Sequence, residues 1–162
     1  MKYTLSILSL ILLLSCKTSK ETTFDVATNE PILVVELHSG NNGRFEAKEQ
    51  KVITTKEGLT DVWTKAYGNY LKKDPVPEVD FSKNVVLLVA MGEKNAGGYT
   101  IKINKVVGSK LNTVVSILET NPGKNCNLTT AMTYPFQIVQ IEKQAKEIVF
   151  NTTTKIIECD SE

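Results

Sequence analysis

The sequence predicts an α+β fold that is mostly antiparallel β, with one amphipathic helix packed on a β-sheet or partial barrel. Only one segment carries apolar residues at helical spacing, whereas several segments are β-branched or alternate between polar and apolar residues. The connections between these segments are short and contain turn residues, which favours antiparallel pairing. We therefore expect several strands and a single helix.

The first segment of the chain is expected to be an export signal. Lys2 precedes an apolar stretch, residues 5–14, which is about half the roughly 20 residues that a membrane-spanning helix needs. It leads into Leu-Leu-Ser-Cys at residues 13–16, which resembles the bacterial lipobox, whose cysteine is lipidated before the signal is cleaved. Residues 1–15 are thus the predicted lipoprotein signal peptide and Cys16 the predicted lipid-bearing residue. The alternative is an ordinary signal peptide that happens to contain a cysteine.

A lipidated Cys16 would place the mature chain in the cell envelope. The diacylglycerol and N-acyl groups of a bacterial lipoprotein supply the two or more lipid chains that stable anchoring requires. Lys17 stands where a retention aspartate would mark the inner membrane, which favours the outer membrane. Whether the domain faces the periplasm or the cell exterior stays open.

Charge and length narrow the possible functions. Removing residues 1–15 discards Lys2 and no acidic residue, so 18 basic and 18 acidic residues remain. A neutral chain offers no basic field for nucleic acid. Residues 16–30 are expected to carry the lipid and form a polar tether, and residues 31–162 to form a single β-rich domain. We expect no cofactor, and the oligomeric state is left undetermined.

Two cysteines remain after Cys16 is assigned to lipid. Cys126 and Cys159 form an even pair in an oxidising compartment, so we predict a disulfide between them. Two buried free thiols are the alternative. A metal site is disfavoured, because two isolated cysteines and one histidine are too few ligands.

The strands are predicted from β-branched and alternating segments. Residues 31–37 form the first run, a turn follows at residues 39–43, and a second strand is expected around residues 50–54. Residues 85–90 are all apolar, as in a strand covered on both faces. Alternation predicts the remaining strands, at residues 99–104, 113–119, 136–141, 148–151 and 155–159.

The helix is predicted from one apolar and aromatic stripe. Its members recur at steps of three and four: Leu59, Val62, Trp63, Ala66, Tyr67, Tyr70 and Leu71. Thr54 and Glu57 fit a capping box at its start, and Pro75 and Pro77 are expected to stop it. Its aromatic residues are expected to face the core rather than to form a ligand site.

A glycine-rich connection at residues 92–98 is the first candidate for binding. Gly97 and Gly98 allow positive φ and a close approach of the backbone to another surface. The residues alone favour a plain hairpin whose glycines serve turn geometry, with Tyr99 facing inward. The alternative is a binding loop in which Asn95, Gly97, Gly98 and Tyr99 make the contacts.

A second candidate is the long connection at residues 121–136, which contains Cys126 and Tyr134. A disulfide to Cys159 would hold it down. We favour a pinned surface loop; the alternative is that it lies beside the Gly97–Gly98 turn as a second contact. A cis Tyr134–Pro135 bond stays open.

Residues from about 80 to 150 carry a family resemblance. The features are the Asp80-Phe81 entry, the apolar strand to Met91, Gly92, the Gly97-Gly98-Tyr99 turn with Ile101 and Ile103, Pro122-Gly123 and residues 134–139. Together they resemble the C-terminal domain of the protease complex subunit PrcB family. That family commonly has Thr-Gly-Gly-Tyr at the turn, where this chain has Ala96.

The resemblance implies a non-enzymatic lipoprotein that binds and stabilises another protein, with a secreted subtilisin-like protease as the implied partner. The expected contacts are Asn95, Gly97, Gly98, Tyr99 and Tyr134. Asn-x-x-Gly-Tyr is also faintly similar to the inhibitory loop of chagasin-type cysteine protease inhibitors. An inhibitor, or a binder of a small ligand or glycan in a cleft between helix and sheet, is therefore the alternative.

An enzymatic function is not expected. The chain has one histidine, His38, which lies next to a predicted turn and belongs to no recognisable catalytic constellation. No Gly-x-Ser-x-Gly motif is present. His38 is therefore predicted to be polar surface.

Overall fold

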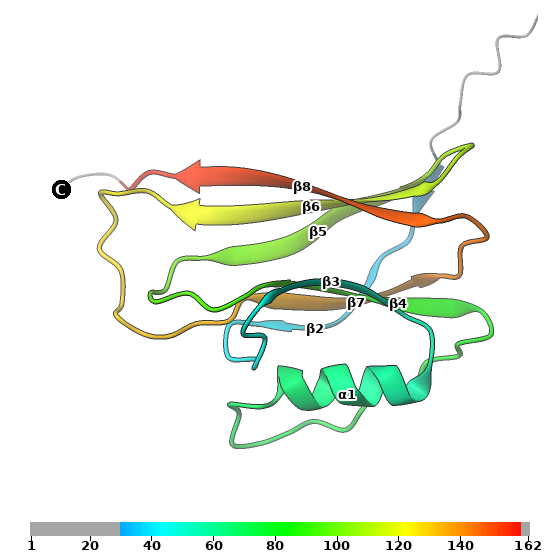
Figure 1. Ribbon diagram of the computed structural model, residues 1–162, viewed down its shortest axis with the longest axis horizontal. Coiled ribbons are helices and arrows are strands. Elements are labelled where there is room, and N and C mark those ends of the chain that lie inside the picture. Colours follow the sequence, from blue (N-terminus) through cyan, green and yellow to red (C-terminus); the bar gives the residue numbers. More distant parts are fainter. Residues whose placement is uncertain (1–29, 160–162) are drawn as a thin grey trace, which may run out of the picture.

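The computed structural model describes residues 30–159, which form two four-stranded β-sheets and one helix in three layers (Figure 1). Sheet A has the strand order β1-β5-β6-β8 and sheet B the order β2-β7-β4-β3. Helix α1 covers the face of sheet B that is turned away from sheet A (Figure 1). The predicted class, mostly antiparallel β with one helix on a sheet, is confirmed. The predicted signal peptide, Cys16 and most of the predicted tether lie outside the described residues.

The elements follow one another in the order β1 (Glu30–Ile32), β2 (Val35–Gly40), β3 (Lys48–Ile53), α1 (Lys56–Ala66), β4 (Asn84–Met91), β5 (Thr100–Gly108), β6 (Thr113–Pro122), β7 (Phe136–Glu142) and β8 (Ile148–Ile157). No helix in this part of the chain has the length and apolarity needed to span a membrane.

Strand β4 lies at the centre of the molecule, as its apolar run predicts. Val86, Leu88 and Ala90 pack beneath the helix, in what we call the helix-side core. The alternate residues of β4 pack against sheet A, in what we call the inter-sheet core: Val85, Leu87, Val89 and Met91. Because β4 pairs with β3 on one side and β7 on the other, both its faces and both its edges are covered.

The helix is shorter than its predicted stripe. It begins after Thr55, whose hydroxyl accepts the Gly58 N–H at 3.1 Å, so the predicted capping box from Thr54 to Glu57 is wrong by one residue. It ends at Ala66, well before Pro75, and the fully exposed Leu71 lies outside it. After the helix the chain turns back over the aromatic residues, where Asp74 accepts hydrogen bonds from Trp63 and Tyr67.

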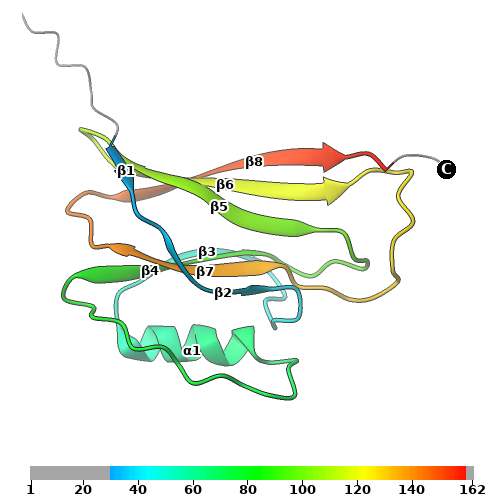
Figure 2. The same cartoon turned by 180° about the vertical axis from the view of Figure 1, so that it is seen from behind.

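The first predicted strand is two strands in two sheets. β1 pairs with β5 in sheet A, and the chain then crosses to sheet B, where β2 pairs with β7 (Figure 2). β2 also extends to Gly40, into the region predicted as a turn. Conversely, the two strands predicted within residues 148–159 are one continuous strand, β8. Periodicity does not report which sheet a residue joins, so these divisions are not visible in the sequence.

Strand β8 departs from the expected antiparallel pairing. It runs parallel to β6 over the whole of its length. The chain leaves sheet A after β6, reverses direction to run through sheet B as β7, and reverses again to return as β8. Two reversals restore the original direction, so β6 and β8 are parallel.

Candidate functional site

The segment between β4 and β5 crosses from one sheet to the other, so the expected hairpin is wrong. β4 belongs to sheet B and β5 to sheet A, and residues 92–99, which we call the crossing segment, join them at one end of the sandwich. That end, which we call the loop end, lies at the left in Figure 1. The two positive-φ glycines of the described chain lie at the start and near the end of the crossing segment, Gly92 at +78° and Gly98 at +87°.

Glycine is favoured at positions 97 and 98 for different reasons. Gly98 has a backbone conformation that L side chains rarely adopt, and a Cβ there would come within 3.1 Å of Leu128 and 3.2 Å of Pro122. At Gly97 a Cβ would lie 2.6 Å from the Thr129 hydroxyl. Both glycines therefore permit a close approach of the backbone to another segment.

That other segment is the second candidate, residues 123–135, which we call the long loop. Lys94 and Thr133 exchange two backbone hydrogen bonds of 2.8 Å each, and the Gly97 N–H donates to the Thr129 carbonyl at 3.0 Å. The Thr133 hydroxyl donates to the Ala96 carbonyl at 2.8 Å. The structure thus brings the two candidate segments side by side. This agrees with the alternative interpretation of the long loop, in which it lies beside the Gly97–Gly98 turn.

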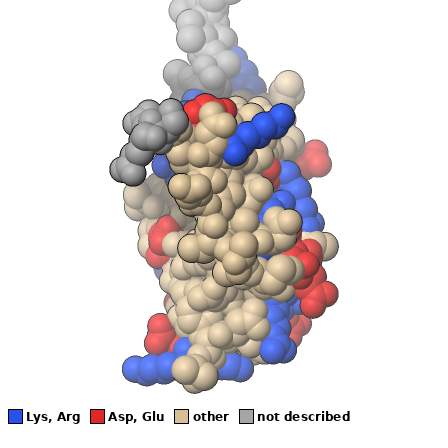
Figure 3. All heavy atoms as spheres, turned by 90° about the vertical axis from the view of Figure 1, so that its left-hand side faces the viewer, with Lys and Arg blue, Asp and Glu red and all other residues tan. Residues whose placement is uncertain are grey.

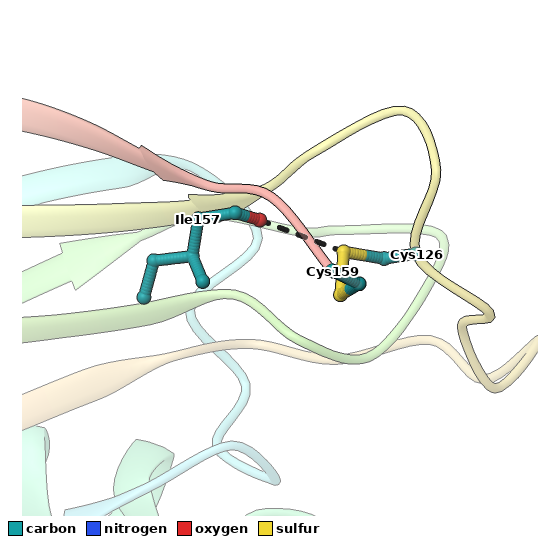
Figure 4. Close-up of a disulfide and its surroundings, with 3 residues drawn as sticks. All are labelled: Cys126, Ile157 and Cys159. Atoms are coloured by element: carbon teal, nitrogen blue, oxygen red, sulfur yellow. Dashed lines mark hydrogen bonds between the residues drawn. A yellow bond between two sulfur atoms is a disulfide. The ribbon is translucent and has the colours of Figure 1, made fainter. Parts of the chain in front are cut away.

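The base of the long loop is fastened by the predicted disulfide. Cys126 is bonded to Cys159, just beyond the end of β8. Figure 4 shows the bond beside the backbone of Ile157, whose carbonyl oxygen lies 3.5 Å from the Cys126 sulfur. The same oxygen accepts the Gly123 N–H at 2.8 Å. The loop is therefore held at its base by a covalent bond and along its length by hydrogen bonds.

The two tyrosines of the predicted site have different surroundings. Tyr99 is half-buried, packs against the inter-sheet core, and has the Lys94 amine 5.6 Å from its ring centroid. Tyr134, also half-buried, donates its hydroxyl proton to Glu93 at 2.8 Å, a hydrogen bond that is the main cause of its raised pKa. Asn95 and Gly98 are exposed. The predicted residues lie on two adjoining segments, with Tyr99 directed partly inward.

The surface of the loop end is largely uncharged. Residues 125–140 contain no Lys, Arg, Asp or Glu. Figure 3, which views this end directly, shows a broad uncharged area with charged side chains mainly toward its margins. Two apolar side chains of the long loop are exposed, Leu128 at 37% and Met132 at 52%. Neither was among the predicted contacts, although the uncharged run in the sequence is a signal that could have found them.

The sequence predicts that His38 is polar surface, and the structure shows that this prediction is wrong. It lies on β2, half-buried, with its ring stacked on Tyr67 at 4.6 Å and close to Phe136 at 5.3 Å. Burial lowers its pKa, against the opposing influence of Asp74 and Glu36. Its Nε2 atom is buried without a hydrogen-bond partner. The position follows from the pairing of β2 with β7, which sequence periodicity cannot reveal.

The cleft between helix and sheet that a small ligand would need is filled by core side chains, among them Trp63 and Phe136. An open depression of about 450 Å³ lies instead beside β1, with Glu30, Ile32 and Asn84 in its lining. Across the described 130-residue span no group of three or more His, Cys, Asp or Glu side chains is placed to hold a metal ion. The loop end is therefore the better candidate for a binding site.

Comparison with known protein families supports the resemblance seen in the sequence. Residues 85–142 match the family described as PrcB C-terminal, within the predicted span of about 80–150. The match runs from β4 to β7 and includes the crossing segment and the long loop. No curated protein and no solved structure gave a significant match.

Proposed function

We propose that this protein is a non-catalytic lipoprotein of the cell envelope that binds and stabilises another protein through its loop end. The match to the PrcB C-terminal family supports a role as a subunit of a protease complex. The partner class that this role implies is a secreted subtilisin-like protease.

The observation that carries the proposal is the joining of two loops into one largely uncharged surface. A surface that is already ordered loses little conformational freedom when a partner binds, so more of the contact energy appears as affinity. Exposed Leu128 and Met132 lie on this surface, and charged residues surround it. An apolar centre with a polar rim is the usual composition of a protein–protein interface.

The lipid anchor supports the same function by a different route. A polar tether after Cys16 would confine the domain near the membrane, and confinement raises the effective concentration of any partner held there. For a non-catalytic binding protein, such confinement strengthens binding without any new contact. The anchor is tested by growing cells with labelled palmitate: we expect the wild-type protein to incorporate label and Cys16→Ser to lose it. Label retained by Cys16→Ser would contradict the assignment.

The binding surface is tested by affinity purification of the full-length protein from its own envelope in mild detergent. We expect a partner protein to be recovered with the wild type and to be reduced on the order of tenfold with Met132→Glu, because a charge would be buried in the contact. The matched control is Leu111→Glu, which places the same charge at a residue 88% exposed in the β5–β6 turn, at the other end of the sandwich. Equal recovery with both variants, or recovery of no partner with the wild type, would contradict the proposal.

The same surface would suit a protease inhibitor, because Asn95, Gly98 and Tyr99 all belong to the crossing segment. The activity of a recovered protease separates the two functions. A stabilising subunit keeps or extends protease activity during incubation, whereas an inhibitor lowers it in proportion to the amount added.

A further inference from the structure

Strand β8 forms an open edge of the molecule. It is the last strand of sheet A, paired on one side with β6, and no strand of the described chain pairs with its other side. In Figures 1 and 2 it runs along the upper margin of the described domain. A strand in this position presents a row of backbone N–H and C=O groups to solvent.

Two hydrogen bonds at the ends of β8 show which of its residues point their backbone N–H and C=O groups toward β6 and which point them outward. The carbonyl of Glu147, just before β8, accepts from Thr113, and that of Ile157 accepts from Gly123. Because backbone groups alternate in direction along a strand, the odd-numbered residues of β8 face β6 and the even-numbered residues face outward. The outward set is Ile148, Phe150, Thr152, Thr154 and Ile156.

The other three edges of the two sheets carry features that discourage further pairing. β1 has three residues, one of which is Pro31, and it covers only residues 106–108 of β5. The uncovered part of β5 has a register shift between Ile103 and Lys105, and the Ile103 N–H donates to Gln137. β2 has a register shift between Glu36 and His38, and half of the residues of β3 are charged. Short length, proline, bulges and charge are the usual protections of an exposed edge. β8 has ten residues, no proline, no register shift and a single charge, Lys155.

Three apolar side chains of β8 are exposed, the least of them Val149 at 38%. Ile156 is 62% exposed and Ile157 47% exposed, although both lie in a regular strand. The side chains of Ile148 and Phe150 pack partly against the inter-sheet core, and Thr152 accepts a hydrogen bond of 2.9 Å from Gln50. The first half of the strand is thus partly packed against the core, and its last residues leave the larger apolar surface uncovered.

We propose that β8 pairs antiparallel with β8 of a second copy of this chain, joining two A sheets into one. A pair centred on Thr152 brings the outward set of each copy into register with that of the other, so all their backbone groups find partners. Exposed Ile156 then lies opposite Ile148 of the second copy. Lys155 lies opposite Val149, and Lys146 before the strand lies opposite Glu158 after it, so like charges do not meet.

Self-pairing does not depend on the proposed binding function, because it uses a sheet edge rather than the crossing segment or the long loop. In a pair centred on Thr152, Asn151 of one copy faces Thr153 of the other on the exposed surface. Such a pair makes no mutual hydrogen bonds, so its Cβ atoms come within about 4.5–5.5 Å and are close to disulfide range.

The test is cross-linking of full-length protein in its membrane. Asn151→Cys and Thr153→Cys, expressed together with different tags, are expected to form a disulfide-linked heterodimer at a yield on the order of tenfold above a control. The matched control is Lys102→Cys, which lies exposed on β5, on the far side of β6 from β8 in the same sheet. A variant that cross-links only with a second copy of itself would still indicate antiparallel pairing of β8, with the pair centred on residue 151 or 153 instead of 152. Yields no higher than those of Lys102→Cys, in every combination, would overturn the proposal.

A backbone variant gives an independent measurement. Thr154→Pro removes an outward N–H and no bond to β6, so we expect the purified detergent-solubilised protein to change from dimer to monomer in sedimentation. Thermal unfolding of the same sample establishes that the domain is folded. A folded Thr154→Pro protein that sediments like the wild type would count against pairing through β8.

Discussion

The two cores on either side of sheet B are built from different residues. The helix-side core is rich in aromatic residues: Trp63, Tyr67 and Phe136 pack around His38, and Phe45 packs against Phe136. The inter-sheet core is almost wholly aliphatic, and its members come from β4, β5, β6 and β7. A helix crossing a sheet leaves wide, irregular gaps that rings fill, whereas two facing sheets interdigitate with branched aliphatic side chains.

The polar groups in the two cores also differ. On the helix side, the Trp63 N–H donates to the Asp74 carbonyl at 3.0 Å and the Tyr67 hydroxyl donates to the Asp74 carboxylate at 2.8 Å. Burial, followed by this carboxylate, raises the pKa of Tyr67 to about 12. Between the sheets, Gln137 accepts the Ile103 N–H at 2.6 Å and donates to Glu36. The helix side therefore depends on its rings for hydrogen bonds as well as for packing.

The largest expected effect is the loss of Trp63 from the helix-side core. Trp63→Ala removes a ring that is 6% exposed and leaves the Asp74 carbonyl without its donor. We expect the free energy of unfolding to fall by about 3–5 kcal/mol. Urea denaturation followed by far-ultraviolet circular dichroism measures this, with the fully exposed Leu71→Ala as the control. A loss below about 1 kcal/mol would show that the helix contributes little to the fold.

The next largest effect is expected on the sheet A side, which is cross-linked by a disulfide. The helix side has no disulfide within residues 30–159. Replacing Cys126 and Cys159 by serine is expected to lower the free energy of unfolding by roughly 3 to 4 kcal/mol, because the unfolded chain regains the freedom of the closed loop. Dithiothreitol should lower the wild-type denaturation midpoint and leave that of the double variant unchanged. A wild-type midpoint insensitive to reduction would contradict a stabilising disulfide.

A matched pair of small deletions compares the two cores directly. Ile117→Val acts in the inter-sheet core and Ile138→Val in the helix-side core, and both side chains are buried. Each is expected to cost about 0.5–1.5 kcal/mol. We expect Ile138→Val to cost more, because the rings around it move less readily to fill the space than aliphatic neighbours do. Denaturant midpoints of the two variants decide the order, and the reverse order would show that the aromatic core is the more adaptable.

The smallest expected effect is a pH dependence confined to the helix side. Burial holds the pKa of His38 below its ordinary value of 6.5, so below pH 6.5 the unfolded chain binds a proton more readily than the folded one. The contribution of neutral His38 to stability is therefore present above pH 6.5 and lost as the pH falls. His38→Phe is expected to show a shallower loss of stability than the wild type between about pH 7.5 and about pH 5.5 in denaturant titrations. Parallel curves for the two proteins would exclude His38 as the group responsible.

Local patterns in the sequence determined much of this protein's fold and candidate site. The features determined in this way include the mostly β class, the single helix, the doubly covered strand β4, the Cys126–Cys159 disulfide and the family match around Gly97–Gly98–Tyr99. The physical reason is that periodicity, turn chemistry and cysteine count are properties of short segments or of composition.

Only the tertiary structure decided which segments meet. The division of residues 30–40 between two sheets, the parallel pairing of β8, the burial of His38 and the meeting of Gly97 with Thr129 all depend on contacts between residues distant in the chain. Alternation along a strand says which residues share a face but not which sheet that face belongs to. The candidate binding surface is of this kind: its residues were visible in the sequence, and their assembly into one surface was set by the packing of the two sheets.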